Sequence, residues 1–163
     1  MPMFTPEKAL RDFPKTPVIL SAILNGVDQK RAQKATDGPG GWSVLEVLGH
    51  MNEFEQAFFQ RSRLIVETEM PKFAALDPDA LAKSHHYNDQ KLTEVLASYV
   101  NWRRQHLAYV QALSPEQWQR KGIHPASGEV TLVENVTNTT LHDVNHIEQI
   151  VKALGTSKPL AAL

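Results

Sequence analysis

Hydrophobic residues recur at helical spacing along most of the chain, and the strict alternation typical of strands is almost absent. The clearest pattern begins at Ser43. Ser43 and Glu46 match a capping box, in which the two side chains bond to each other's backbone amides at the start of a helix. The apolar positions that follow share one helical face and are Val47, Met51, Phe54, Phe58 and Ile65. This pattern predicts a helix over about residues 43–68.

Three further helices are predicted in the same way. Near the N-terminus, Pro14 and Pro17 interrupt the chain, so we expect a short turn and then a helix from about residue 17 to 25. Its apolar face consists of Val18, Ile19, Ala22 and Ile23. A third helix is predicted over about residues 89–113. The fourth begins at a second capping box, Thr131 with Glu134, and ends near Leu154 because Gly155 follows.

The segments between these helices are predicted to be loops. The longest covers residues 69–87 and contains two prolines, and another covers residues 121–129. Loops as long as the first are uncommon inside a compact domain and often border a site. Four helices of about 10–25 residues joined in this way favour an all-α protein built as an antiparallel four-helix bundle.

Length and composition limit the class of protein. The 163 residues suit a single domain over residues 1–163. A membrane span needs about 18 consecutive apolar residues, and no run approaches that length. The N-terminus lacks the basic and apolar segments of a secretory signal, so we expect a cytoplasmic protein. With 17 basic and 18 acidic residues scattered along the chain, a nucleic-acid partner is not expected.

The chain has no cysteine and seven histidines. It therefore has no disulfide, no thiol nucleophile and no cysteine ligand for a metal. Any bound metal must be held by His, Asp or Glu side chains. Any thiol chemistry must use a thiol that another molecule supplies.

His142 and His146 are four residues apart on the fourth helix, within a polar stripe that lies beside an apolar one. This spacing places both imidazoles on one face, where they can converge on one ion. The spacing alone is weak evidence for a metal site, because about a quarter of sequences this rich in histidine contain such a pair by chance. The alternative is two histidines at the surface or at the edge of the core. His50 strengthens the metal hypothesis, since it lies on an otherwise apolar face and needs a partner there.

Other side chains are weaker candidates. Glu53 and Glu55 follow His50 and are candidates for a further ligand or a general base, with helix-surface charges as the alternative. Asp143 adjoins His142 in sequence and is a candidate for orienting a ligand. His124, in the second loop, is a candidate for proton transfer at the border of a cleft.

The remaining histidines are assigned no function. His85 and His86 are expected to be flexible loop residues, with a position at the border of a cleft as the alternative, and His106 a structural or exposed one. A carboxylate-bridged di-iron site is disfavoured, because it needs two Glu-x-x-His motifs and the chain has one approximate match, Asp143 to His146.

Three segments together resemble the DinB-like superfamily. They are Trp42–His50 with Glu55 after it, His124–Leu132, and His142–Ile150. The resemblance covers nearly the whole chain in order and spacing.

The resemblance implies an up-down-down-up four-helix bundle. It implies one divalent metal, such as Zn, Ni or Fe, bound by His50, His142 and His146 with open coordination positions. It also implies a homodimer, and characterised relatives include enzymes that use a low-molecular-weight thiol. One branch of the family has Glu at the position of His142, so this chain is similar to the three-histidine branch.

Two functional hypotheses follow. The first is a metal-dependent enzyme, either a thiol S-transferase or a hydrolase acting on a small molecule, in which the metal activates a thiol or water. The second is a non-catalytic, dimeric metal-binding or stress-related bundle. Access discriminates them, since an open cleft beside the three histidines favours the enzyme and bulky side chains closing it favour the second hypothesis.

Overall fold

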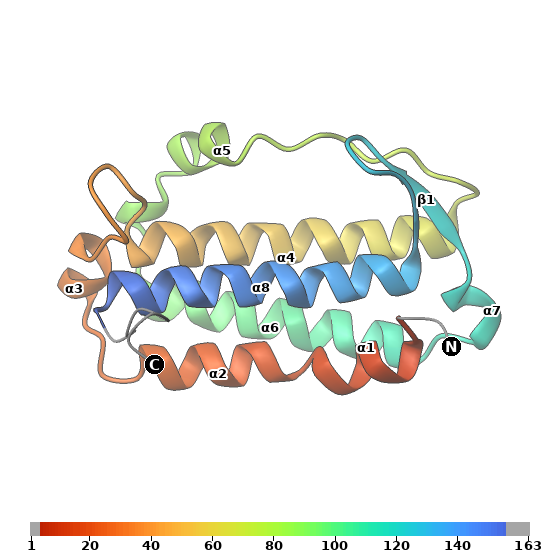
Figure 1. The fold of residues 1–163 in the computed structure, drawn as a ribbon, viewed down its shortest axis with the longest axis horizontal. Helices are drawn as coiled ribbons and strands as arrows, with labels where there is room; N and C mark the ends of the chain where they lie inside the picture. The colour runs from red at the N-terminus through yellow and green to blue at the C-terminus, as the bar shows by residue number, and fades with distance from the viewer. Residues whose placement is uncertain (1–3, 156–163) are drawn as a thin grey trace, which may run out of the picture.

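Four helical segments run along the length of the molecule in the computed structural model, which describes residues 4–155 (Figure 1). They are the consecutive pair α1 (Pro6–Asp12) and α2 (Lys15–Leu24), then α4 (Val44–Glu67), α6 (Leu92–Gln111) and α8 (Leu132–Ala153). The shorter elements are α3 (Gln29–Lys34), α5 (Pro78–Ser84), the 3-10 helix η1 (Tyr87–Asp89), α7 (Pro115–Trp118) and the strands β1 (Lys121–His124) and β2 (Gly128–Thr131).

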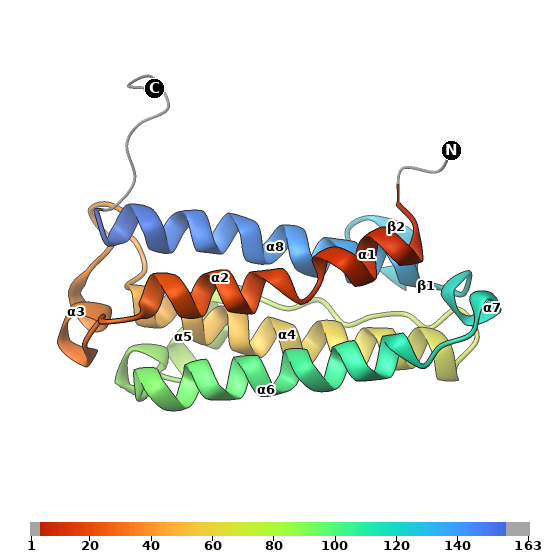
Figure 2. The ribbon, with the colours of Figure 1, turned by 90° about the horizontal axis from the view of Figure 1, so that it is seen from below.

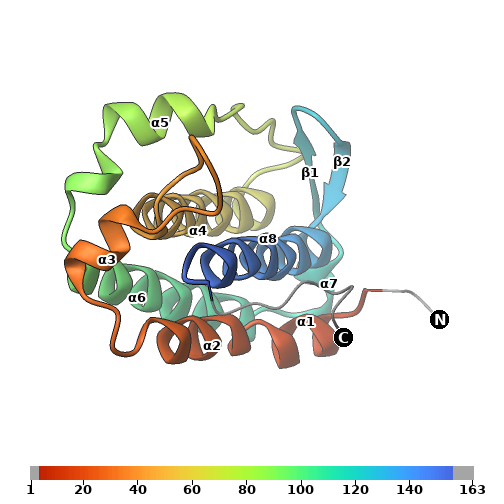
Figure 3. The ribbon, with the colours of Figure 1, turned by 60° about the vertical axis from the view of Figure 1, so that its left-hand side comes forward.

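The long connection between α4 and α6 determines the topology. It returns along the length of the bundle, so α4 and α6 run in the same direction, while α2 and α8 run the opposite way (Figures 1 and 2). The segment with α5 and the β1–β2 hairpin lie on the side of α4 and α8, opposite α1 and α2 (Figure 3). The predicted up-down-down-up four-helix bundle is confirmed.

Both predicted capping boxes are present. Ser43 Oγ accepts a hydrogen bond from the Glu46 amide at 3.1 Å, and the Glu46 carboxylate accepts from the Ser43 amide at 2.7 Å. Thr131 and Glu134 make the same pair of bonds at the start of α8. Gly155, with a φ of 69°, follows the end of α8 as expected. The boundaries of α4 and α8 therefore match the prediction closely.

The N-terminal prediction is wrong in two respects. The expected turn is the helix α1, whose first turn Thr5 caps by accepting from the Lys8 amide. α2 begins at Lys15, two residues before the predicted start, because Pro17 then lies in the first helical turn, where no backbone donor is needed. The buried residues of α2 are Thr16, Pro17, Leu20 and Leu24, whereas Val18 and Ile19 are exposed.

The segment predicted as a second loop is a β-hairpin, with Lys121 opposite Thr131. Its first strand also makes hydrogen bonds to the long connection between α4 and α6. Ile123 N donates to the Pro71 carbonyl at 2.7 Å, and the Phe73 amide donates to the Ile123 carbonyl at 2.9 Å. The hairpin thus joins the long connection to the start of α8. That connection is itself partly helical, because it contains α5 and η1.

The interior consists of two apolar clusters with polar side chains between them. One cluster centres on Leu20, Leu48, Tyr99 and Ile150, and the other on Phe13, Ile65, Val110 and Val136. The side chains between them come from all four helical segments and are fully or almost fully buried. We call them the polar layer: Thr16, Glu55, Ser62, Arg103, His106, Asn135, Thr139 and Asp143.

Arg103 is the centre of the polar layer. Its Nε and Nη2 donate to Glu55 Oε2 at 3.0 and 2.5 Å, and Nη2 also donates to Asp143 Oδ2 at 2.7 Å. Thr16 and Tyr99 donate to the same Asp143 oxygen. These bonds compensate charges that would be costly to bury alone. Within residues 4–155, no helix is long and apolar enough to cross a membrane.

Candidate metal centre

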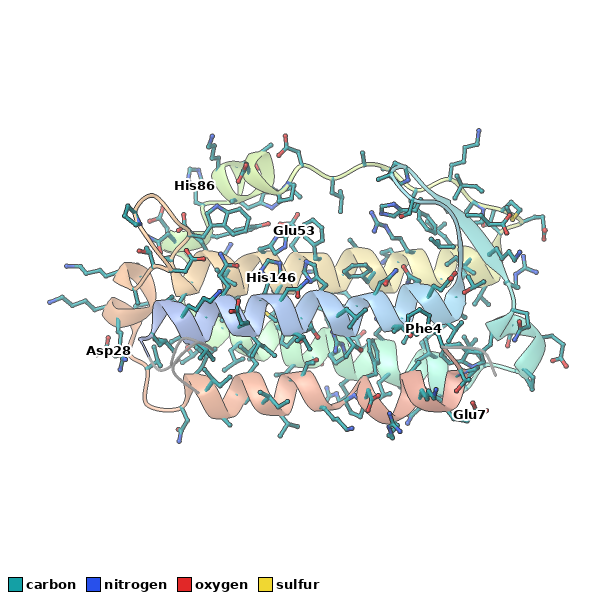
Figure 4. The ribbon with its side chains drawn as sticks, in the orientation of Figure 1. Phe4, Glu7, Asp28, Glu53, His86 and His146 are labelled. Carbon is teal, nitrogen blue, oxygen red and sulfur yellow. The ribbon has the colours of Figure 1, made fainter. Side chains whose placement is uncertain are left out.

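Three histidines from two helices converge on one side of the bundle. His50 comes from α4, and His142 and His146 come from successive turns of α8. Each offers a ring nitrogen, and these three atoms all lie within 4.8 Å of one another. Nε2 of His50 is 2.9 Å from Nε2 of His142, and the His146 ring centroid is 4.5 Å from each of the other two. Figure 4 labels His146 on α8, where it adjoins α4.

The environment keeps all three imidazoles neutral. Burial, together with the neighbouring histidines, lowers the pKa of His50 to about 3 and that of His142 to about 2. Burial also lowers the pKa of His146, although Gln149 and Asp143 oppose the shift. Neutral imidazole is the form that binds a metal.

Gln149 determines which nitrogen of His146 carries the proton. The Gln149 Oε1 atom can only accept, and it lies 2.9 Å from His146 Nδ1, so Nδ1 donates and Nε2 keeps its lone pair. A metal-binding histidine is usually oriented by a bond of this kind. The sequence alone did not single out Gln149. Its position three residues after His146 was the available signal.

The donor set fits a divalent metal. The two Nε2 atoms of His50 and His142, at 2.9 Å, repel each other unless a proton or a cation lies between them. Imidazole ligands suit Zn, Ni, Fe and Cu, and three of them leave coordination positions open. The rings of Trp42 and Phe54 pack beside His50, with centroids 5.2 and 4.1 Å from its own. These rings shield one side of the cluster from water.

A cavity of about 550 Å³ adjoins the cluster at His142. Its walls come from α4, α8, the hairpin and residues 75–76 of the long connection. Its volume lies within the usual range for small-molecule sites, about 300–1,000 Å³. The three histidines therefore lie beside an open cleft, and the long connection borders it as the sequence suggested.

Comparison with known proteins identifies the family. The sequence profile of the DinB superfamily matches residues 13–150. The chain belongs to the DinB superfamily.

Curated relatives of this DinB-superfamily chain include three bacterial proteins with similar names. It is 25% identical over 114 residues to "Putative metal-dependent hydrolase OB0782" of Oceanobacillus iheyensis, covering 68% of this chain and 64% of the relative. It is 24% identical to "Putative metal-dependent hydrolase OB0413" of the same organism, covering 83% and 77%. It is also 24% identical to "Putative metal-dependent hydrolase YfiT" of Bacillus subtilis, covering 72% and 68%.

Solved structures with the same DinB-superfamily fold include two that differ in reported activity. The structure of Bacillus subtilis YfiT, described as a probable metal-dependent hydrolase with an unusual four-helix bundle topology, matches with a TM-score of 0.77 at 20% identity, covering 93% of this chain and 89% of that one. A mycothiol-dependent maleylpyruvate isomerase matches with a TM-score of 0.73 at 13% identity, covering 90% and 60%. At these identities the likeness establishes the fold.

Two predicted residues of the DinB-superfamily chain lie outside the cavity. Glu55 belongs to the polar layer, where Arg103 holds one carboxylate oxygen and His106 Nδ1 lies 2.9 Å from the other. Asp143 bonds to Thr16, Tyr99 and Arg103, and among the described residues no hydrogen bond joins it to the histidine cluster. The catalytic role predicted for Glu55 and the orienting role predicted for Asp143 stay predictions.

Glu53 lies near the cluster but faces another cleft. Its carboxylate accepts from the Tyr87 hydroxyl and lies 2.7 Å from His85 Nδ1, so it links α4 to η1. His85, which was expected to be a flexible loop residue, thus contacts a predicted site residue. The proton-transfer role predicted for Glu53 stays a prediction.

His124 lines the same cavity as His142. The amides of Ala126 and Ser127 both donate to its Nδ1 at 3.3 Å, which leaves the proton on Nε2. Burial and the positive charge of Arg61 lower the pKa of His124.

The other two histidines lie away from the cavity. His106 is fully buried in the polar layer, and His86 is exposed. Of the four weaker candidates, the structure brings only His124 to the cavity beside the cluster, within the described residues.

Proposed function

We propose that this chain is a metal-dependent enzyme that binds one divalent metal through His50, His142 and His146 and acts on a small molecule in the adjoining cavity. One observation carries the proposal. Three neutral imidazoles with converging nitrogens form a cluster, and one of them, His142, lines an open cavity of about 550 Å³. A non-catalytic metal-binding protein would need the cluster but not the cavity.

A bound divalent metal would act as a Lewis acid and lower the pKa of water or of a thiol, so that a nucleophile forms near neutral pH. The chain's own residues have separate tasks. Gln149 orients His146 through the Nδ1 bond. Phe54 and Phe58 form an apolar wall that limits water beside His142. His124 carries its proton on Nε2 and is the candidate to donate a hydrogen bond to a substrate oxygen in the cavity.

Hydrolysis is the reaction class that the names of the curated relatives favour. Transfer to a low-molecular-weight thiol is the second candidate. Two observations support it: the chain has no cysteine of its own, and its fold matches that of a mycothiol-dependent isomerase. The chain covers 60% of that isomerase, so the comparison supports the shared fold, and the reaction has to be tested by experiment.

The metal site is tested by elemental analysis of purified wild type, His50→Ala and His146→Ala. We expect about one divalent metal per wild-type chain and almost none in either variant, because two imidazoles hold an ion far less tightly than three. His86→Asn is the matched control, since it removes an exposed histidine and suits the left-handed backbone, with a φ of 48° at that position. Stoichiometric metal in both cluster variants would overturn the site.

The reaction class is tested with two assays on metal-loaded and chelator-treated protein. One follows hydrolysis of nitrophenyl esters, and the other follows transfer of several small thiols to a chloronitrobenzene. Metal-dependent turnover in the first assay alone supports a hydrolase, and turnover that needs the thiol supports a transferase. Stoichiometric metal without turnover across both panels would favour the non-catalytic hypothesis.

A further inference from the structure

Arg61 is a buried cation without an anionic partner. Only 8% of the residue is exposed, and among the described residues no carboxylate lies within ion-pair distance of it. Of the five N–H groups of a guanidinium, one makes a hydrogen bond, from Nη2 to the Ala74 carbonyl at a long 3.4 Å. Among the described residues, none of its nitrogen atoms is both fully buried and unpaired, so the unbonded N–H groups are accessible from the cavity that Arg61 lines.

Arg103 shows how the same bundle treats a buried arginine that has a structural role. Two carboxylates, Glu55 and Asp143, hold it, and the Phe13 carbonyl and the Thr16 hydroxyl accept from its Nη1. Arg61 has no comparable set of acceptors. Arg61 therefore has N–H groups available to bind a partner that enters the cavity from outside the chain.

The cavity beside the histidine cluster is where such a partner would bind. Arg61 and His142 both line it, and no Asp or Glu of residues 4–155 does. His124 lines it as well and, with Nδ1 occupied, has its proton on Nε2. Nearby, Asn138 adds an amide. The cavity thus combines a cation with neutral hydrogen-bond donors and contains no acidic side chain.

The Phe58 ring separates the two ends of this cavity. Its centroid is 5.4 Å from that of His142 and 5.6 Å from the guanidinium carbon of Arg61. Phe73 holds the guanidinium on another side at 5.4 Å. A ligand that reaches both ends therefore passes over an aromatic surface, with the histidine cluster at one end and the guanidinium at the other.

We propose that Arg61 binds the anionic group, a carboxylate or a phosphate-type oxyanion, of a small molecule whose reacting end lies at the histidine cluster. A guanidinium matches both kinds of oxyanion through paired hydrogen bonds. The placement of the reacting end at the histidine cluster rests on the proposed function, because it assumes that the cluster binds a metal. The anion site itself rests on Arg61 and the acid-free cavity.

The test measures binding of three probes of similar size by calorimetry. Hydrocinnamate carries a carboxylate, phenethylphosphonate carries a phosphate-like group, and hydrocinnamamide carries neither charge. We expect wild type to bind at least one anionic probe about tenfold or more tightly than the amide, because charge-assisted hydrogen bonds are about twice as strong as neutral ones. The two anionic probes distinguish the kinds of oxyanion. Equal binding of all three by wild type would overturn the proposal.

Variants of Arg61 and of a neighbouring arginine test whether Arg61 causes the preference for anionic probes. Arg61→Met keeps the apolar stem against Phe58 and Phe73, and should bind the anions and the amide equally. Arg61→Lys keeps the positive charge but lacks the paired N–H groups of a guanidinium, so it should retain part of the preference for anions. Arg63→Met is the matched control, because it removes an exposed arginine that pairs with Glu67 on the same helix. If Arg61→Met and Arg61→Lys both keep the full preference, another residue binds the anion and the proposal fails.

Metal content separates this proposal from the proposed function. The same titrations are run on chelator-treated protein and on wild type loaded with zinc, and elemental analysis of Arg61→Met should show wild-type metal content. An anion preference in protein that binds no metal would support Arg61 and contradict the metal site. Normal metal binding without any anion preference would contradict the Arg61 proposal alone.

Discussion

Glu55 is enclosed by groups that favour its charged form. Burial alone would raise the pKa of this carboxyl, but the charge of Arg103 and the hydrogen bonds from His106 and Arg103 outweigh burial, so the pKa lies below its ordinary value. Asp143 receives a single bond from the same guanidinium, and burial raises its pKa. Glu55 is therefore the stronger of the two carboxylate partners of Arg103.

Glu55→Gln should lower the free energy of unfolding by about 3 kcal/mol near neutral pH, the range seen when one partner of a buried ion pair is removed. The difference from wild type should depend on pH. A depressed carboxyl pKa stabilises the fold fully above its ordinary value of 4.5, and this contribution is lost as the pH falls through the lower pKa of the folded state. Urea unfolding of both proteins across this range measures it.

The control for this prediction is Glu67→Gln. Glu67 is half exposed and pairs with Arg63 one turn away, so its removal should cost well under about 1 kcal/mol at any pH. A Glu55→Gln protein as stable as wild type at neutral pH would show that the buried pair contributes no net stability.

Among the elements, η1 and α4 meet at Gly49. A Cβ atom placed on Gly49 would lie 2.7 Å from Cγ and 2.9 Å from Cβ of Tyr87. Alanine has a helix propensity better than glycine by about 1 kcal/mol, but relieving such an overlap typically costs about 1–3 kcal/mol. Gly49→Ala should therefore lower the melting temperature despite its better propensity.

Thermal unfolding of Gly49→Ala beside Gly38→Ala checks this prediction. An added Cβ at Gly38 meets no atom within 4 Å, so that variant should be neutral or slightly more stable than wild type. A gain in stability for Gly49→Ala would mean that η1 moves aside at little cost and that Tyr87 does not fix its position on α4.

The elements that the sequence predicted well are those with local signals. Both capping boxes act within four residues, and they located the starts of α4 and α8. The β1–β2 hairpin was missed because each strand has only four residues, and because Ile123 also bonds to Pro71 and Phe73, some fifty residues earlier, which no local pattern reveals. The apolar face of α2 was misassigned because Thr16 points inward to Asp143, so polarity is inverted where the helix meets the polar layer.

For the whole molecule, the sequence revealed part of the candidate site. His142 and His146 share a helix, and His50 was conspicuous on an apolar face, so their convergence could be expected. Arg61 was missed because in the sequence it is an ordinary charged position of the helix that became α4. Only the fold shows that Arg61 lies in a cavity bordered by the β1–β2 hairpin and the long connection. The expected homodimer, the cytoplasmic location and one domain over residues 1–163 stay predictions.

Metal binding should stabilise the whole bundle, because the three ligands come from α4 and α8 and an ion held by them joins the two helices. A ligand that binds only the folded state at about 100 times its Kd adds roughly 2.7 kcal/mol to the free energy of unfolding. In a domain of this size that corresponds to a rise of about 5–10 °C in melting temperature. Calorimetry of wild type with zinc and with a chelator should show this difference, and His146→Ala should not. An equal rise in His146→Ala would mean that the ion stabilises the chain from some other place, and the link between α4 and α8 would have to be abandoned.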